Sequence, residues 1–102
     1  MKIVHGLIAA AALAAAGLTQ AQAPDAAQVR SWAASCANCH GTDGRAQPGM
    51  ESLAGANKDE MVKKMLDFKA GRKPATIMHQ LSKGYTDEQI VAIAGYFAAQ
   101  NK

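Results

Sequence analysis

Aromatic residues, cysteines and prolines are scarce in this chain, which has five aromatic residues, two cysteines and three prolines among 102 residues. A domain of this size with so few large apolar side chains usually needs a disulfide, a metal or a cofactor for stability. Strand-forming residues are also few, which argues against a β-sheet. The length leaves room for one domain. We therefore expect a single small helical domain that is built around a further group.

A strong charge of one sign is absent as well. The formal net charge is +3 at pH 7, and it falls to about +2 if Lys2 is removed with the N-terminal segment. Lysine and arginine alternate with aspartate and glutamate instead of forming a basic stripe. A nucleic-acid-binding face needs such a stripe, so we expect no nucleic-acid partner.

No apolar run is long enough for a permanent membrane helix, which needs about 20 residues. The run over residues 7–18 follows the basic Lys2 and precedes a polar stretch, the pattern of a secretory signal peptide. Cleavage after Ala21 is favoured over cleavage after Ala23, because the latter places Pro24 directly behind the bond. An uncleaved membrane anchor is the alternative interpretation. The pattern predicts a signal peptide over residues 1–21, a domain over residues 22–102, a periplasmic location and no stable membrane insertion after cleavage.

Helical periodicity begins soon after this segment. Asp25 is a suitable N-cap, and the residues that follow on one helix face are Val29, Ala33, Cys36 and His40. The sequence therefore predicts a first helix whose face ends in a cysteine and a histidine.

Three more helices are expected after an irregular loop over residues 41–55, which is rich in glycine, proline, threonine and aspartate. The second is predicted over residues 57–71, between an asparagine N-cap and a closing glycine. The third is a short segment, residues 77–83, with Thr76 as its cap. The last opens with a threonine and glutamine capping box at 86 and 89 and carries an apolar stripe of Ile90, Ile93, Ala94 and Phe97. The predicted fold class is all-α, with about four helices.

Residues 36–40 read Cys-Ala-Asn-Cys-His, and the spacing C-x-x-C-H is the attachment signature of c-type haem. Two cysteines three residues apart lie about one helical turn from each other. Both sulfurs can then form thioethers to the two vinyl groups along one edge of a porphyrin, and the histidine can turn under the ring to ligate the iron. We therefore expect one covalent haem c, with Cys36 and Cys39 as attachment points and His40 as an iron ligand.

Three other uses of the motif are less consistent with the sequence. A thioredoxin-like dithiol needs βαβ units around it, whereas an alanine-rich helix precedes Cys36. A structural zinc site would have only His79 to join the three residues of the motif, at no recognised spacing. A disulfide between Cys36 and Cys39 would close a very short, strained loop and add little stability.

The sixth iron ligand has to come from a distant residue, and the candidates are Met50, Met61, Met65, Met78 and His79. Met61 and Met65 lie four residues apart on an amphipathic helix, so core packing accounts for them. Met50 follows the histidine of the motif by only ten residues and would have to reach around the ring edge.

Met78 is the favoured sixth ligand. It lies 38 residues past His40, in the short segment between Pro74 and Gly84 that is placed to cross the opposite face of the haem. Its neighbour His79 points about 100° away from it on a helix, so only one of the two can face the iron. A second imidazole in place of the thioether would lower the reduction potential.

The chain resembles the class I c-type cytochromes, in the branch that contains cytochrome c4 and the haem subunit of flavocytochrome c sulfide dehydrogenase. Residues 36–44 (CANCHGTDG) look like the haem-binding opening, and Pro48 with Leu53-Ala54-Gly55 is similar to the Pro-x-Leu-Ala-Gly loop of that family, stretched here by residues 49–52, which stand where the family has one residue. In the family the carbonyl of this proline accepts the Nδ1 hydrogen of the haem-ligating histidine. The resemblance thus implies that Pro48 orients His40.

The phrases Asp-Phe-Lys-Ala-Gly at 67–71, Thr-Ile-Met at 76–78 and Ala-Gly-Tyr-Phe at 94–97 look like the sulfide dehydrogenase haem subunit in particular. The methionine of Thr-Ile-Met ligates iron in that family, which supports Met78. Better-known members carry two haem domains, whereas this chain has one C-x-x-C-H motif. The resemblance implies a single-haem class I cytochrome c fold.

We expect the chain to transfer single electrons in the periplasm and to be no enzyme, because it has no nucleophile and base pair and no carboxylate dyad. The resemblance implies a flavoprotein dehydrogenase partner that oxidises sulfide. The loop over residues 44–56 has only Arg45 and Glu51 as charges, which suits a lasting subunit contact. The alternative is a freely diffusing carrier to a terminal oxidase or reductase. A haem enzyme open to small ligands would require that Met78 does not bind iron.

Overall fold

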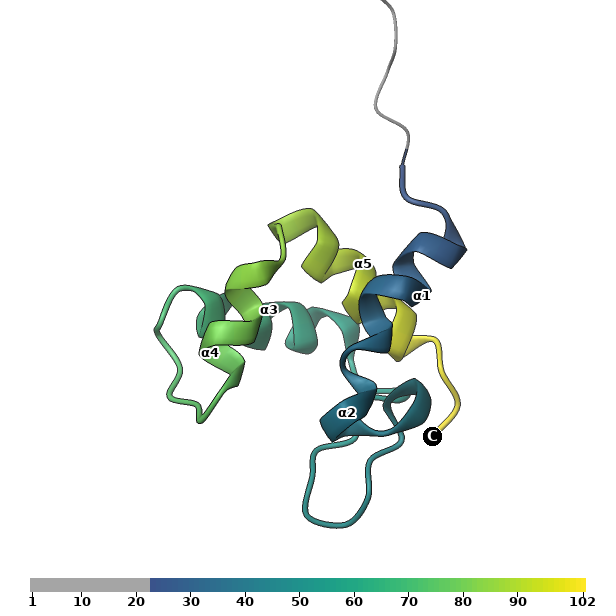
Figure 1. Ribbon diagram of the computed structural model, residues 1–102, viewed down its shortest axis with the longest axis horizontal. Helices are drawn as coiled ribbons and strands as arrows, with labels where there is room; N and C mark the ends of the chain where they lie inside the picture. Colours follow the sequence, from purple (N-terminus) through teal and green to yellow (C-terminus); the bar gives the residue numbers. More distant parts are fainter. Residues whose placement is uncertain (1–22) are drawn as a thin grey trace, which may run out of the picture.

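The computed structural model describes residues 23–102. This part of the chain has five α-helices, two 3-10 helices and no strand (Figure 1). In chain order the elements are α1 (Ala26–Ala34), α2 (Ala37–His40), η1 (Thr42–Gly44), α3 (Lys58–Lys69), α4 (Met78–Leu81), η2 (Ser82–Gly84) and α5 (Asp87–Ala98). The predicted all-α fold class is confirmed. The predicted signal peptide, residues 1–21, lies outside the described residues.

Side-chain caps set the start of the three longer helices. Asp25 and Asn57 each accept a hydrogen bond from the backbone amide three residues later, at 2.8 and 3.0 Å. The capping box at α5 is complete: the Thr86 amide donates to the Gln89 side chain at 2.8 Å, and the Gln89 amide donates to Thr86 Oγ1 at 3.1 Å. Caps of this kind contribute about 1 kcal/mol each, and all three are as predicted.

The first helix ends earlier than predicted. α1 ends at Ala34, and the histidine of the motif belongs to the separate helix α2. At the break the Cys36 amide donates to the carbonyl of Ala33, three residues back, at 3.1 Å. The Ser35 hydroxyl donates to the carbonyl of Trp32 at 3.3 Å, and such local side-chain bonds compete with the helical pattern. The backbone angles of Ser35 and Cys36 remain in the right-handed helical region, so the motif follows α1 through one tightened turn.

The third helix forms at the predicted place but without the predicted cap. Its N-cap is Ile77, not Thr76, and no side chain caps it. The carbonyl of Ile77 instead accepts the amides of Gln80 and Leu81, at 2.9 and 3.1 Å. Met78 is consequently the first residue of α4, and η2 continues the segment to Gly84.

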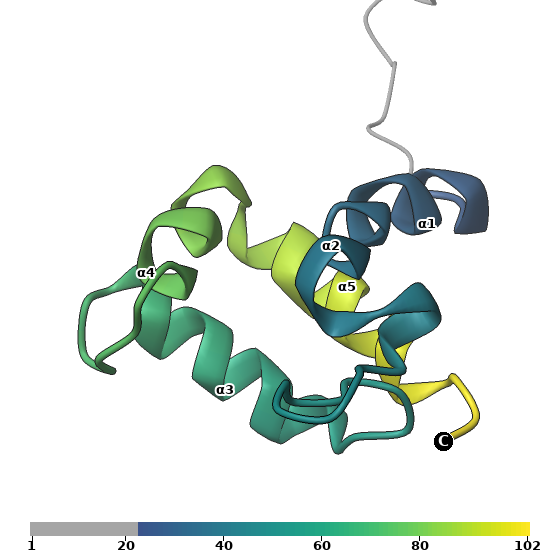
Figure 2. The same ribbon diagram turned by 60° about the horizontal axis from the view of Figure 1, so that its bottom comes forward.

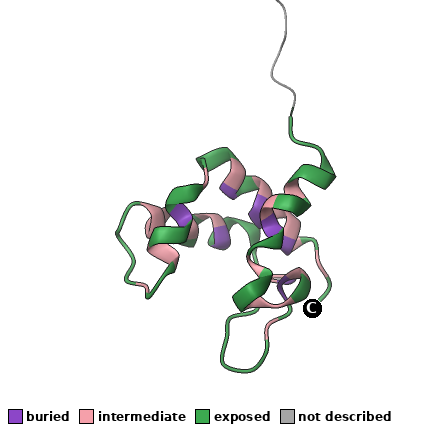
Figure 3. Cartoon of the chain, in the orientation of Figure 1, coloured by how far each residue is buried: buried purple, intermediate pink, exposed green. Residues whose placement is uncertain are grey.

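The core is built on the predicted apolar stripe of α5. Its four residues are all buried, and three of them, Ile93, Ala94 and Phe97, form one cluster with Ala33 of α1 and Met61 of α3. In the described part of the chain the buried apolar residues are few and three of them are alanines: Ala33, Ala54, Met61, Ile90, Ile93, Ala94 and Phe97. The buried segments gather along α5 and where α1 and α3 meet it, and most of the remaining surface is exposed or half-buried (Figure 3).

Candidate functional site

The imidazole of His40 is held by the loop that follows its own helix. Its Nδ1 atom lies 2.6 Å from the carbonyl oxygen of Glu51. A carbonyl can only accept a hydrogen bond, so Nδ1 carries the proton and donates it. The lone pair of the neutral ring therefore lies on Nε2, which is the arrangement that a metal-binding histidine needs.

This contact corrects the role predicted for Pro48. The structure gives His40 Nδ1 a partner three residues further along the loop, at Glu51, and Pro48 is exposed. The stretched loop explains the shift, because residues 49–52 stand where the family has one residue and carry the chain past the proline before it reaches the imidazole. The sequence pattern thus located the loop correctly but placed the acceptor at the wrong carbonyl.

The two thiols lie at the break between α1 and α2 and within α2. Both are free in the structure: Cys36 is half-buried and packs against the core cluster, whereas Cys39 is exposed. Burial raises the pKa of the Cys36 thiol above its ordinary value. The amides of Cys39 and His40 both donate to the Cys36 carbonyl, at 3.3 and 2.9 Å. One helical turn therefore holds the two sulfurs and the imidazole on a single short element.

Two glycines after the motif make a tight return of the chain toward α5. Both have positive φ, +81° at Gly41 and +82° at Gly44. A Cβ at Gly41 would lie 1.9 Å from the Arg45 carbonyl oxygen, and one at Gly44 would lie 2.8 Å from a ring carbon of Phe97. Only glycine fits this backbone geometry and this approach. The Gly44 carbonyl in turn accepts the Leu53 amide at 2.8 Å, which closes the loop over residues 45–53.

A hydrogen bond ties the same turn to the last helix. Tyr96 of α5 donates from its hydroxyl to Asp43 Oδ1 at 2.5 Å, and this bond raises the pKa of the Tyr96 hydroxyl above its ordinary value. Asp43 has the left-handed φ of +52°, which aspartate adopts more readily than most residues. The turn that follows the C-x-x-C-H segment is thus anchored to α5.

Met78 and His79 stand together at the start of α4, and both are half-buried. Among the described residues, His79 Nδ1 is the buried side-chain atom that lacks a hydrogen-bond partner. The apolar neighbours Ile77 and Leu81 are about half exposed, at 53% and 48%. The segment around Met78 thus exposes apolar side chains to solvent.

The other methionines have different environments. Met61 is buried in the core, at 9% exposure, and Met65 accepts a hydrogen bond on its sulfur from the fully buried hydroxyl of Ser82, at 3.6 Å. These contacts are those of packing residues, as predicted for both. Met50 is 48% exposed at the tip of its loop.

α2 and α4 lie toward opposite ends of α3 in both views (Figures 1 and 2). α3 packs against α4 and α5, and α1 packs against α5. The side chain of Glu51 joins the loop to α3 through Lys64 Nζ at 2.8 Å. His40 is therefore linked to α3 through Glu51 and Lys64, and Met78 lies on α4, which packs against the same helix.

The residues present fit a covalently attached haem. The fit rests on the unprotonated Nε2 of His40, two free thiols on the same turn, a half-buried thioether on a separate element and an unpartnered buried imidazole atom beside it. The sequence reasoning missed Glu51 and the pair of Tyr96 with Asp43. The pairing of an aspartate in the motif with a distant tyrosine leaves no periodic signal in the sequence, because the two are separated by 53 positions.

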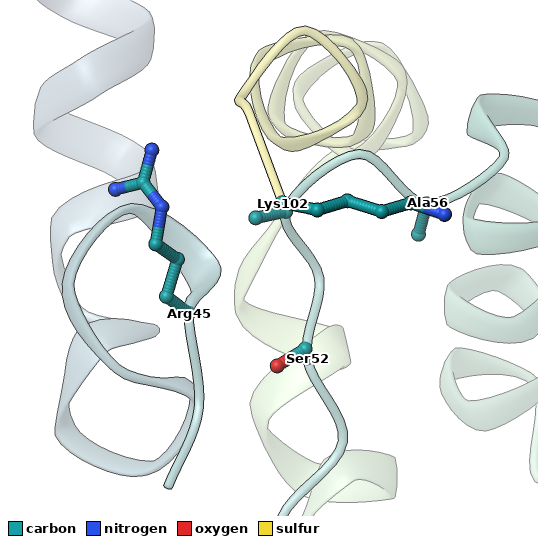
Figure 4. Close-up of a pocket in the computed structure, with 5 residues that line it drawn as sticks. Arg45, Ser52, Ala56 and Lys102 are labelled. Carbon is teal, nitrogen blue, oxygen red and sulfur yellow. The ribbon is translucent and has the colours of Figure 1, made fainter.

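A pocket of about 410 Å³ lies on the surface between the loop that follows the C-x-x-C-H motif and the C-terminal residues (Figure 4). Its lining residues are Arg45, Ser52, Ala54, Ala56 and Lys102, none of which is a predicted haem ligand. Arg45 Nε donates to the carbonyl of Asn101 at 3.0 Å. The pocket therefore marks where the chain end meets the loop.

Two further features of residues 23–102 bear on the site. No helix there has the length and apolar character to cross a membrane. In the same part of the chain, no three side chains of histidine, cysteine, aspartate or glutamate gather as a group that could hold a metal ion.

Comparison with known proteins adds an independent line of evidence. The family model described as cytochrome c matches residues 26–100. The chain is 41% identical over 68 residues to the cytochrome subunit of sulfide dehydrogenase from Chlorobaculum tepidum, a match that covers 67% of this chain and 62% of that protein. It is 39% identical over 85 residues to cytochrome c4 from Pseudomonas aeruginosa, covering 82% of this chain and 42% of that protein.

A third relative is similar over its whole length. The chain is 33% identical over 103 aligned residues to cytochrome c-553 from Nitratidesulfovibrio vulgaris, covering 96% of this chain and 98% of that protein. The chain thus spans less than two thirds of the length of the first two relatives and nearly all of the third.

Proposed function

Because the chain belongs to the cytochrome c family, whose members are electron carriers with covalently bound haem c, we propose that Cys36, Cys39, His40 and Met78 hold one such haem. The resemblance to class I c-type cytochromes close to the sulfide dehydrogenase subunit is confirmed by the comparisons. The haem supplies an iron that alternates between ferric and ferrous states and so carries one electron. The protein residues attach, orient and enclose it.

The two cysteines attach the group in this proposal. Their Sγ atoms form thioether bonds to the two vinyl groups, which is supported by the free state of both thiols and by their place on one turn. Replacing Cys36 and Cys39 together by serine should abolish the haem-stained band on a denaturing gel. A stained band that survives the double replacement would overturn the assignment.

His40 and Met78 are the two proposed axial ligands. The bond from His40 Nδ1 to the Glu51 carbonyl orients the ring and leaves Nε2 to face the iron. Met78 provides the thioether from α4, where its half-buried position supports the role. The pair gives the iron one imidazole and one thioether, a combination that favours the ferrous state more than two imidazoles do.

The axial methionine can be tested by spectroscopy of the ferric protein. Met78→Ala should remove the weak near-infrared band of the thioether and iron, and it should open the iron to cyanide or carbon monoxide. Met50→Ala and His79→Ala serve as matched controls and should leave this band in place. Loss of the band in the Met50 variant alone would identify a different ligand.

The physiological role that we propose is electron acceptance from a sulfide-oxidising flavoprotein. The single observation that carries this proposal is the 41% identity to a sulfide dehydrogenase cytochrome subunit. The nearly uncharged loop supports it, because both of its charges are paired within the chain: Glu51 with Lys64 at 2.8 Å, and Arg45 with Asp43 at 3.9 Å. A surface of this kind suits a lasting subunit contact more than a steered encounter.

Purification from the native host tests the partner. In the subunit role, the cytochrome co-elutes with a flavin-containing chain at high salt, and sulfide reduces the haem only when that chain is present. The alternative is a freely diffusing carrier to a terminal oxidase or reductase, which the whole-length similarity to cytochrome c-553 favours. A monomer whose electron exchange with an oxidase slows steeply as salt rises would establish this alternative.

We also propose that the protein works in the periplasm after removal of residues 1–21. The support is the charge and apolar pattern of the N-terminal segment. N-terminal sequencing of the protein from a periplasmic fraction would distinguish a start at Gln22 from one at Pro24. Recovery of the intact N-terminus in the membrane fraction would instead establish an uncleaved anchor.

A further inference from the structure

The two proposed iron ligands lie on segments with different packing partners. α2, which ends with His40, packs against η1, whereas α4, which begins with Met78, packs against α3 and η2. The two helices lie toward opposite ends of α3 (Figures 1 and 2). An iron that is ligated from both sides needs these segments at a fixed separation, so a direct contact between them bears on the site.

Tyr85 and Ser35 make such a contact, because their hydroxyl oxygens lie 2.8 Å apart. Tyr85 directly follows η2, the continuation of α4, and Ser35 directly precedes Cys36. Within the described chain, this is the only hydrogen bond between the motif segment, residues 35–40, and the ligand segment, residues 77–85. We call the pair of Tyr85 and Ser35 the hydroxyl latch.

The direction of the latch follows from a second hydrogen bond. The Ser35 hydroxyl donates to the carbonyl of Trp32 at 3.3 Å. A serine hydroxyl has one hydrogen to donate, so Tyr85 is the donor of the latch and Ser35 is its acceptor. Each bond in such a chain polarises and strengthens the next. The ring of Tyr85 is half-buried and packs against the core cluster, so the latch joins the core to the end of α1.

The ligand segment has few other connections of this kind. α4 has no side-chain cap. The fully buried hydroxyl of Ser82 donates to the sulfur of Met65 on α3 at 3.6 Å, and a thioether is a weak acceptor. Among residues 23–102, the latch and this sulfur contact are the hydrogen bonds that join residues 77–85 to other elements. The latch is therefore the stronger of the two.

We propose that Tyr85 and Ser35 are positioning residues that keep Met78 at the iron. This inference rests on the proposed ligation by Met78. Displacement of Met78 moves its segment away from the motif segment and breaks the latch. The latch thereby lowers the population of protein in which the iron is open to other ligands. The apparent affinity for such a ligand is reduced by the same factor.

Titration of the ferric haem-loaded protein with imidazole measures this population, because imidazole takes the place of the thioether. Tyr85→Phe keeps the ring and removes the hydroxyl. The loss of one hydrogen bond should lower the apparent dissociation constant for imidazole about three- to tenfold. The near-infrared band of the thioether and iron should disappear at correspondingly lower imidazole concentrations. Ser35→Ala should have the same effect, whereas Ser35→Thr retains a hydroxyl and should restore the wild-type affinity.

Tyr96→Phe is the matched control. It removes a tyrosine hydroxyl that bonds to Asp43 over 53 positions, outside the ligand segment. A general loss of stability would raise imidazole affinity equally in Tyr96→Phe and Tyr85→Phe, and that result would contradict the proposal. The affinity of Tyr96→Phe should instead equal that of wild type. Ser35→Ala combined with Tyr85→Phe should bind imidazole no more tightly than the tighter single variant, and additive effects would show that the two residues act separately.

Hydrogen exchange follows the ligand segment independently of the iron. The amides of Gln80 and Leu81 donate to the Ile77 carbonyl, and in Tyr85→Phe they should exchange about three- to tenfold faster than in wild type. Equal acceleration in Tyr96→Phe would also count against the latch.

The wild-type spectrum separates failure of the latch from failure of the proposed function. A near-infrared band in wild type, together with unchanged imidazole affinity in Tyr85→Phe, would overturn the latch and leave Met78 as the ligand. A ferric wild-type protein without the band would overturn the ligation by Met78, and the inference that rests on it would fall as well.

Discussion

The Nδ1 atom of His40 and the carbonyl oxygen of Glu51 lie 2.6 Å apart, and the side chain of Glu51 is bound by Lys64 of α3 at 2.8 Å. The imidazole is thus oriented by a backbone atom whose own position depends on an ion pair to another helix. Because the acceptor is a carbonyl, the identity of side chain 51 matters only through this anchor. Through this ion pair, α3 helps to orient the imidazole of His40, the proposed iron ligand on α2.

Lys64→Gln should weaken the anchor without removing the carbonyl. The ion pair is half-exposed, so the free energy of unfolding should fall by no more than about 1 kcal/mol. The Nδ1 proton of His40 in the ferrous protein should exchange faster with solvent, as measured by NMR. Pro48→Ala is the control and should leave this proton unchanged. A faster exchange in the Pro48 variant, with none in the Lys64 variant, would return the acceptor role to Pro48.

The difference between Pro48 and Glu51 shows where sequence reasoning was sufficient and where it failed. The C-x-x-C-H motif, the caps at Asp25, Asn57 and Thr86, and the stripe of α5 are local patterns, and they were predicted correctly. The hydrogen-bond acceptor depends on the path of a lengthened loop, which no periodicity encodes.

The break before α2 has a similar cause. Ala33 and Cys36 have a helical spacing, but the last bond of α1 tightens to three residues there, and the Ser35 hydroxyl bonds to the Trp32 carbonyl at the same place. The same hydroxyl lies 2.8 Å from the hydroxyl of Tyr85, a contact over 50 positions. The location of the motif was therefore predictable, whereas its orientation required tertiary contacts.

Gly44→Ala should destabilise the fold by about 2 to 4 kcal/mol, because the methyl group would meet Phe97 and the backbone has a φ of +82°. Gly71→Ala is the matched control, since Gly71 has a φ of +78° and nothing within 4 Å of its Cβ position. It should lose only the conformational part, about 1 kcal/mol. Denaturant titration of both variants measures the two costs. Equal losses would show that the contact with Phe97 contributes nothing.

Tyr96→Phe should lower stability by about 1 kcal/mol at neutral pH through loss of the hydrogen bond to Asp43. The bond to Asp43 raises the pKa of Tyr96 from its ordinary value of 10.0. The contribution of a group with a raised pKa is complete below the unfolded value and is lost as the pH rises through the folded value. The difference in melting temperature between wild type and variant should therefore be constant from pH 6 to about pH 9 and shrink above pH 10. A difference that persists unchanged at pH 11 would contradict this account.

Asp67→Asn should destabilise the turn after α3, in which the Asp67 carboxylate binds Lys63 and Arg72. This effect should be lost at low pH, whereas the effect of Tyr96→Phe is lost at high pH. The hydrogen bonds from Lys63 and Arg72 lower the pKa of Asp67 below its ordinary value of 3.8. The contribution of a carboxylate with a lowered pKa is present above the unfolded value and is lost as the pH falls through the folded value. The melting temperature of the variant should therefore lie below that of wild type at pH 7, and the two should begin to converge as the pH falls below 3.8.

Lys63→Gln is the control for this last prediction, because it removes one partner of Asp67 and leaves the carboxylate and its bond to Arg72. Its effect on the melting temperature should be smaller than that of Asp67→Asn and should fade over the same acidic range. Salt should reduce both effects, since Lys63 and Arg72 are largely exposed. An Asp67→Asn difference that does not change with pH across the acidic range would mean that ionisation of the Asp67 carboxylate does not stabilise the turn.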